Sequence, residues 1–374
     1  MKVVQIVTQM EAAGAQRVAY LLHEGLRSRG HDAELWFLYF KRPAYFGKPG
    51  VRVLSNRRPS LLGYFLFAIK LLGWIRNHKP EVIITHTHYA NVLGLLVGAA
   101  AGIRRRVAVQ HNPLATYPTF ARYADWLLGT VGIYTKQIAV SHSVADSMSA
   151  YPECYKRSVC TIYNGSALDQ NGCLSSQLMA KLPAGRPRIL HVGRLARQKN
   201  HEALLKSLQQ RPGAHLVLVG DGELRGTLEQ QVQALGLAGR VCFLGEIAPE
   251  EVRAVMNVCD LFMFPSLYEA LGMALIEAMA AGMPIVASDI PAHREVLHDS
   301  GILVPPDPKE LSRAARELLA DISRARELGK KAAERTRMFS VEEMVDSYER
   351  LIACETQPSH SGEKGFPSRA RTTA

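Results

Sequence analysis

Residues 260–288 read DLFMFPSLYEALGMALIEAMAAGMPIVAS, and this stretch decides the fold. Its first five residues form an apolar run short enough to be a buried strand, and a loop with proline and serine follows. Residues 271–281 are rich in Leu, Met and Ala and predict a helix, which Gly282 ends before a second apolar run. Strand, loop, helix and strand in this order build a parallel sheet, so we expect an α/β fold.

Two carboxylates stand out in this unit. Glu269 lies in the loop before the predicted helix, and Glu277 lies inside a helix that is otherwise uncharged. The start of a helix offers unpaired backbone N–H groups, so we expect a phosphate on the amides of Leu271, Gly272 and Met273. The two carboxylates would then bind hydroxyl groups of the same ligand. Alternatively, Glu277 pairs with a nearby base and Glu269 is a solvated loop charge.

The spacing Glu269-x7-Glu277 resembles the E-x7-E signature of the retaining glycosyltransferases of family 4. Ala270-Leu271-Gly272 stands where that family commonly has Gly-Phe-Gly. The resemblance implies a GT-B fold, in which two Rossmann-like domains face each other across a cleft and the second binds a nucleotide sugar. It covers about residues 1–354.

The composition is that of an ordinary soluble protein, with 47% hydrophobic and 21% charged residues among 374. Six scattered cysteines without a CxxC pair argue against a zinc site or a disulfide framework. The N-terminal MKVVQIVTQM resembles a first strand more than a signal peptide. We therefore expect a cytoplasmic protein without a metal or another cofactor.

The net charge of +11 belongs to the first half of the chain. Residues 1–180 hold 20 Lys and Arg against 9 Asp and Glu, whereas residues 181–374 hold 25 of each kind. Such asymmetry indicates an anionic partner. No nucleic-acid-binding motif accompanies it, so we expect peripheral contact with the anionic inner face of the cell membrane and no nucleic acid.

Residues 61–75, LLGYFLFAIKLLGWI, form the most apolar run of the chain. The run is shorter than the roughly 20 residues that span a bilayer and contains Lys70. It predicts either a core helix or an interfacial helix on a membrane.

The loop after the first predicted strand, residues 8–17, leads into a helix and is suited to phosphate. It lacks the GxGxxG fingerprint, which disfavours a dinucleotide. The resembling family usually has Gly-Gly-x-Glu-Arg here, and this chain keeps Gly14, which we assign to the ligand site, and Arg17. Arg17 could also serve only as a cap or in a salt bridge.

Three histidines follow predicted strands, where ligands bind in open parallel sheets: His86, His88 and His111. A strand-end histidine is more often structural than catalytic. The resemblance singles out His111, because the family commonly has a histidine near the C6 hydroxyl of the donor sugar. No acidic ligand is spaced to complete a metal site.

The second half begins with a strand and then Gly193-Arg194-Leu195, with Lys199-Asn200 shortly after. The resemblance makes this the donor-phosphate motif, in which Arg194 and Lys199 would neutralise the departing diphosphate. The alternative is two solvated surface cations. A later strand ends at Ile247, where the family commonly meets the nucleotide base through backbone groups.

The domain boundaries follow from these elements. Residues 1–165 form an acceptor-binding domain and 166–187 a linker, and residues 188–340 form a nucleotide-sugar-binding domain. A helix over 341–354 crosses back to the first domain, and the polar segment 355–374 is expected to be disordered.

We therefore predict a retaining, metal-independent glycosyltransferase of the hexosyltransferase type. The catalytic candidates are Arg194, Lys199, Glu269 and His111, and front-face substitution follows from the resemblance. The basic first domain favours a lipid-linked or cell-envelope glycan acceptor, as in polysaccharide or lipopolysaccharide biosynthesis. The alternatives are a non-catalytic nucleotide-sugar-binding subunit of another glycosyltransferase and a GT-B nucleotide-sugar epimerase.

Overall fold

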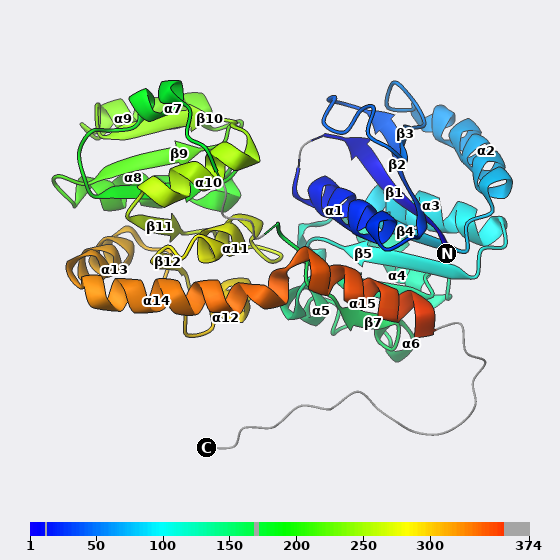
Figure 1. Ribbon diagram of the computed structural model, residues 1–374. Helices are drawn as coiled ribbons and strands as arrows, with labels where there is room; N and C mark the ends of the chain where they lie inside the picture. The colour runs from blue at the N-terminus through cyan, green and yellow to red at the C-terminus, as the bar shows by residue number, and fades with distance from the viewer. Residues whose placement is uncertain (12, 168–171, 355–374) are drawn as a thin grey trace, which may run out of the picture.

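The computed structural model describes residues 1–11, 13–167 and 172–354. In these residues the chain forms two α/β domains, each built on one parallel sheet (Figure 1). The predicted tail 355–374 and part of the predicted linker lie outside the described residues. Two parallel-sheet domains are the architecture that the GT-B resemblance implied.

The N-terminal sheet has the strand order β3-β2-β1-β4-β5-β6-β7. Its central strands β1 and β4 are almost entirely buried, because helices cover both faces of the sheet. The order reverses between β1 and β4, and ligands bind beyond the strand ends at such a switch point. The strands are β1 (Lys2–Met10), β2 (Asp32–Phe40), β3 (Val51–Val53), β4 (Val82–His86), β5 (Arg105–Gln110), β6 (Lys136–Ala139) and β7 (Val159–Thr161).

Two helical layers cover this sheet. Helix α1 packs on one face with α15, and α2, α3 and the end of α4 pack on the other. No helix of the described residues has both the length and the apolar character needed to span a membrane. The helices of the domain are α1 (Gly14–Ser28), α2 (Leu61–His78), α3 (His88–Ala100), the short η1 (Leu114–Thr116), α4 (Thr119–Thr130), α5 (His142–Asp146) and α6 (Glu153–Lys156).

The C-terminal sheet has the order β10-β9-β8-β11-β12-β13, and its switch point lies between β8 and β11. The strands are β8 (Arg188–Val192), β9 (His215–Val219), β10 (Val241–Gly245), β11 (Leu261–Phe264), β12 (Ile285–Ser288) and β13 (Ile302–Val304). The helices are α7 (Ser176–Lys181), η2 (Arg197–Lys199), α8 (His201–Gln209), α9 (Arg225–Ala234), α10 (Pro249–Val258), α11 (Met273–Ala280), α12 (Pro291–Leu297), α13 (Pro308–Ala320), α14 (Ile322–Arg335) and η3 (Thr336–Phe339).

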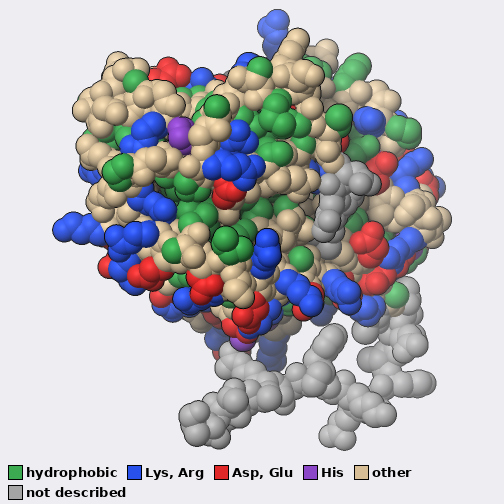
Figure 2. Space-filling view, turned by 60° about the vertical axis from the view of Figure 1, so that its left-hand side comes forward, with side chains coloured by type: hydrophobic (Ala, Val, Ile, Leu, Met, Phe, Trp, Pro, Cys, Tyr) green, Lys and Arg blue, Asp and Glu red, His purple; other side chains and the backbone are tan. Residues whose placement is uncertain are grey.

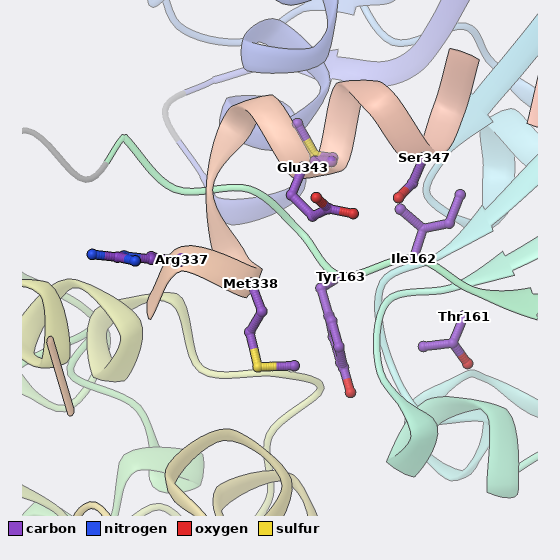
Figure 3. A pocket seen from close by; sticks show the side chains of 8 residues that line it. Thr161, Ile162, Tyr163, Arg337, Met338, Glu343 and Ser347 are labelled. Carbon is purple, nitrogen blue, oxygen red and sulfur yellow. The ribbon is translucent and has the colours of Figure 1, made fainter. Parts of the chain in front are cut away.

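The chain crosses between the domains after β7 and again after η3. The two crossings lie side by side, and the Ser166 amide donates to the Phe339 carbonyl at 2.8 Å. A cavity of about 390 Å³ lies where they meet, with Tyr163 from the first crossing and Met338 from the second among its lining residues (Figure 3). None of the predicted site residues lines this cavity, so we assign it to the hinge between the domains.

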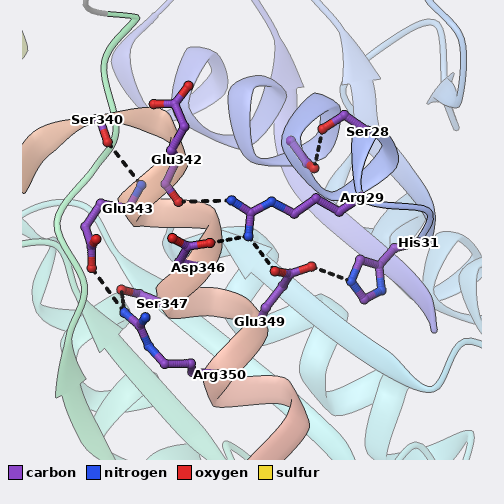
Figure 4. A network of polar contacts seen from close by, with 11 residues as sticks. Ser28, Arg29, His31, Ser340, Glu342, Glu343, Asp346, Ser347, Glu349 and Arg350 are labelled. Carbon is purple, nitrogen blue, oxygen red and sulfur yellow. Dashed lines mark hydrogen bonds and ion pairs between the residues drawn. The ribbon is translucent and has the colours of Figure 1, made fainter.

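Helix α15 (Val341–Cys354) is the second crossing's continuation, and it docks on α1 of the N-terminal domain. Arg29, the cap of α1, forms ion pairs with Asp346 and Glu349 (Figure 4). His31 Nε2 lies 2.8 Å from the second of these carboxylates. The last helix of the chain therefore fastens the C-terminal domain to the N-terminal one.

Candidate active site

The loop between β11 and α11 carries the E-x7-E residues. Gly272 caps the helix in the left-handed conformation, with φ +89°, which a residue with a side chain rarely adopts. Leu271 is buried in the core of the domain and anchors the loop. The amides at this helix start, including Met273, are therefore held at the switch point of the sheet, where a phosphate is favoured.

Lys199 and Glu269 meet at this switch point. Lys199 Nζ lies 2.5 Å from Glu269 Oε1, and the side chains are only 14% and 8% exposed. Lys199 comes from η2, which follows β8, and its ammonium lies 4.6 Å above the Phe264 ring. A Cβ on Gly193 would lie 3.1 Å from Lys199 Cε, so the glycine leaves room for the lysine stem. The two predicted catalytic residues thus form one pair.

Arg194 lines a different space, a cavity of about 630 Å³ between the two domains. Carboxylates and cations from both domains surround it, and Arg42 lies 3.5 Å from Glu246 across the gap. Gly14 begins α1 beside Ala13, which also lines this cavity, and a Cβ at Gly14 would meet open space. The lining residues are Gln9, Glu11, Ala13, Lys41, Arg42, Arg194, Asp221, Gly222, Glu223 and Glu246.

Glu277 lies on α11 and contacts the other domain. Arg17 Nη1 of α1 donates to Glu277 Oε1 at 2.7 Å. The salt bridge that we considered as the alternative role of Arg17 and of Glu277 is therefore present, and it joins the two domains. The Ser141 hydroxyl donates to the Ala270 carbonyl, a second contact between the domains beside the E-x7-E loop.

His111 directly follows β5 and is buried beside His86. The ring nitrogens His86 Nδ1 and His111 Nε2 lie 3.0 Å apart, and His86 Nε2 lies 2.9 Å from the side-chain amide of Gln5. Burial lowers the pKa of His111 to about 4 and the pKa of His86 well below its usual value. Both rings are therefore neutral at pH 7, and the neighbouring strand ends of β4 and β5 bring them together.

Another cavity, of about 310 Å³, opens at the switch point of the N-terminal sheet, and we call it the second cavity of the candidate site. His88 lies at its wall, and His88 Nε2 is buried without a hydrogen-bond partner among the described residues. Thr87 before it has φ +75°, a strained value for a β-branched residue. The lining residues are Thr8, Gln9, Gln16, Tyr39, Arg58, Tyr64, Thr87, His88, Tyr89, Asn112 and Tyr117.

Ile247 follows β10 and packs, partly buried, against the core of the C-terminal domain. Its neighbour Glu246 lines the cavity between the domains, so the backbone at this point lies close to that space. Among the described residues, no three His, Cys, Asp or Glu side chains are grouped so that they could hold a metal ion.

Sequence comparison assigns both halves of the chain. The profile described as Glycosyltransferase Family 4 matches residues 12–170, and the profile described as Glycosyl transferases group 1 matches residues 179–335. The chain belongs to glycosyltransferase family 4. The family that the E-x7-E motif predicted is thereby confirmed.

Relatives and solved structures agree with the family. The chain is 28% identical over 305 residues to the lipopolysaccharide core biosynthesis glycosyltransferase LpsE of Rhizobium meliloti, covering 80% of this chain and 83% of that protein. It is 41% identical over 120 residues to a phosphatidyl-myo-inositol mannosyltransferase of Mycobacterium tuberculosis, covering 30% of each. The crystal structure of Anabaena HepE with UDP superposes with a TM-score of 0.81 at 22% identity, covering 95% of this chain and 100% of that one. The last match confirms the GT-B fold.

Sequence reasoning did not single out the tyrosines and Asn112 of the second cavity. It also did not single out the acidic wall of the cavity of about 630 Å³ between the domains. Tyr39, Tyr64 and Tyr89 come from three separate segments and show no shared motif. Glu295 was also missed, although its carboxylate accepts from the amides of His142 and Ser143 at 2.6 and 3.0 Å and joins the domains. Among these residues, Asn112 lies just beyond the end of β5, and that position was the signal that the sequence offered for it.

Proposed function

We propose that this family 4 glycosyltransferase moves a sugar from a nucleotide-sugar donor to an acceptor hydroxyl with retention of the anomeric configuration. The observation that carries the proposal is the Lys199–Glu269 pair at the switch point of the C-terminal sheet, beside the capped start of α11. A cation and a helix start suit a diphosphate, and the carboxylates of Glu269 and Glu277 suit hydroxyl groups of the donor.

The donor would lie between the domains. Arg194 and Lys199 would stabilise the charge that develops on the diphosphate as its bond to the anomeric carbon breaks. The acceptor oxygen would form its bond to that carbon on the same face, and its proton would pass to the departing phosphate oxygen. His111 would face the sugar as a neutral hydrogen-bonding group, in agreement with the lowered pKa. This mechanism needs no metal ion.

The acceptor would enter through the second cavity, at the switch point of the N-terminal sheet. Tyrosine rings and amides line this cavity, and such groups suit a sugar or another polyol. The basic charge of this domain and the naming of LpsE and the mannosyltransferase favour an acceptor that is lipid-linked or part of the cell envelope. Such an acceptor would place the enzyme at the inner face of the membrane.

Nucleotide binding tests the donor site directly. A ligand that binds only the folded chain raises its melting temperature, so UDP, GDP and ADP are compared, with UDP first because HepE was crystallised with it. We expect one nucleotide to stabilise the protein and Arg194→Ala to remove the shift. If no nucleotide shifts the wild-type melting temperature, the donor site is wrong.

Two further assays separate the alternatives. Chelator should leave transfer unchanged; loss of transfer with chelator and recovery with Mg²⁺ or Mn²⁺ would contradict metal independence. The anomeric configuration of the product, determined by NMR, tests retention. A protein that binds nucleotide but only supports the activity of a partner would be the non-catalytic subunit, and Lys199→Ala would leave that activity intact.

A further inference from the structure

Among the described residues, most of the exposed large hydrophobic side chains lie on one side of the N-terminal domain. Of the fifteen large hydrophobic side chains that are exposed in the described part of the chain, ten belong to α2, α3 and α4 or to the residue that caps α4. Phe120 is 78% exposed and Phe65 is 71% exposed. We call this set the apolar face: Phe65, Leu66, Ile69, Tyr89, Leu96, Phe120, Tyr123, Trp126, Leu127 and Val131.

The three helices form one layer. Helix α3 contacts both α2 and α4, and α2 and α3 lie side by side at the edge of the molecule away from the C-terminal domain (Figure 1). On α4 the exposed positions Phe120, Tyr123 and Leu127 are three and four residues apart, which places them on one stripe of the helix. The opposite sides of α2 and α3 pack on the sheet, so these helices are apolar both inward and outward.

The charge around the apolar face has one sign. The exposed charged side chains of α2, α3 and α4 are Lys70, Arg76 and Arg122, all basic, and the one carboxylate on these helices, Asp125, is buried. Exposed Lys70 and Arg122 lie on α2 and α4 among the apolar positions. The C-terminal domain differs: it balances its charges, and Figure 2, which brings it forward, shows basic and acidic side chains close together.

We propose that the apolar face docks on an anionic lipid bilayer, with aromatic and aliphatic side chains in the interface and Lys and Arg on the phosphates. Exposed Phe, Trp and Leu beside basic residues are the composition of interfacial membrane helices. A second copy of the chain fits this face less well, because two copies meeting face to face would bring two basic surfaces together.

This docking would place the second cavity at the membrane surface. Tyr89 belongs to both the apolar face and the cavity wall. Tyr64, also in the cavity wall, lies in the first turn of α2 directly before Phe65, and Arg58 of the same wall lies three residues before this helix begins. An amphiphilic acceptor would then keep its chain in the bilayer, its phosphate or other anionic group near Arg58 and its head group in the cavity. This last step rests on the proposed function, whereas the docking itself does not.

Flotation of the purified protein with lipid vesicles tests the proposal. We expect binding to vesicles of phosphatidylcholine mixed with phosphatidylglycerol, weaker binding to phosphatidylcholine alone, and a decrease of binding with added salt. Phe65→Ser with Ile69→Ser on α2, and separately Phe120→Ser with Leu127→Ser on α4, should each lower binding at least about tenfold. The effect of the α4 pair distinguishes a face of several helices from one apolar helix.

The matched control carries Met179→Ser and Ile322→Ser, two exposed apolar positions of the C-terminal domain. It should bind vesicles like the wild type. The nucleotide-induced shift in melting temperature is measured for every variant, so that a folding defect or a failure of the donor site is recognised separately. Wild-type protein that does not float with anionic vesicles, or face variants that bind like the control, would overturn the proposal. So would a dimer in vesicle-free solution that the face variants convert to a monomer.

Discussion

Arg17 of α1 and Glu277 of α11 form an ion pair of 2.7 Å that joins the two domains on the donor side of the cleft. Glu277 is also the second carboxylate of the E-x7-E motif, which we propose to bind a hydroxyl group of the donor. The arginine occupies Oε1, which leaves Oε2 as the acceptor for a ligand hydroxyl. In the proposed function, the domain arrangement and the donor site would therefore be coupled through one carboxylate.

This coupling predicts different effects for the two partners. Glu277→Gln should weaken nucleoside diphosphate-sugar binding about tenfold or more, because a hydrogen bond to a charged group is lost. Arg17→Ala should change this binding only a few-fold, because its partner keeps the carboxylate. A double-mutant cycle on the free energy of unfolding should give a coupling free energy between Arg17 and Glu277 of no more than about 1 kcal/mol. The Arg17 side chain is 31% exposed, so solvent screens the pair. Equal loss of binding in both variants would contradict the assignment of Glu277 to the ligand.

The pair of Lys199 and Glu269 yields a second prediction. Lys199→Met keeps most of the stem that packs beside Gly193 but removes the charge, and it should lower kcat/KM at least about 100-fold. Glu269→Gln should have a similar effect, and the double variant should lose little more than either single one, because the residues act as a unit. The measurement is steady-state transfer, or donor hydrolysis where no acceptor is known. Lys206→Met, which breaks the exposed Lys206–Glu202 pair on α8, is the control and should be active.

The elements around the site follow closely from the sequence. Residues 271–281 predict a helix, and α11 spans Met273–Ala280 because Gly272 caps it at positive φ. Helix α7 was missed, because residues 166–187 have the composition of a linker. The Ser175 hydroxyl nevertheless caps α7 by accepting the Leu178 amide, and Leu178 is buried in the core of the domain. Tertiary burial, which the local composition does not reveal, stabilises this short helix.

The contacts between the domains could not be predicted in the same way. Arg17 and Glu277 are far apart in the chain, and their pairing depends on how the two domains are oriented. By contrast, the placement of Lys199 near Glu269 follows from topology, because both follow neighbouring strands of a parallel sheet and the ends of such strands converge. Sequence patterns therefore predicted candidate residues within each domain, whereas the cavities that these residues line could be recognised only from the folded structure.

Buried histidines predict loss of stability in mild acid. Burial lowers the pKa of His111, His201 and His293 to about 4, whereas an unfolded chain has histidine pKa values near 6.5. Between these values the unfolded state binds more protons than the folded state, so the stabilisation present above about pH 6.5 is lost as the pH falls toward 4. Each histidine contributes a slope of up to about 1.4 kcal/mol per pH unit.

Urea unfolding at several pH values between about 7 and 4.5 measures this slope. His201→Gln should reduce this slope by about one proton, because the amide does not titrate. A wild-type free energy of unfolding that stays level over this range would show that the histidines are protonated in the folded chain.

The last prediction concerns the hinge. A Cβ added to Gly165 would lie 2.7 Å from Val341 Cα and 2.9 Å from the Ser340 carbonyl oxygen, both backbone atoms of the second crossing. Gly165→Ala should therefore force the two crossings apart and destabilise the protein by about 1–3 kcal/mol. Gly73→Ala on α2, where a Cβ meets nothing within 4 Å, should instead stabilise the protein by roughly 0.5–1 kcal/mol. Urea unfolding of both variants measures whether each substitution lowers or raises the free energy of unfolding. Small-angle X-ray scattering with and without nucleotide tests whether Gly165→Ala changes how closely the two domains approach each other. A Gly165→Ala variant as stable as the wild type would show that the crossings separate without cost.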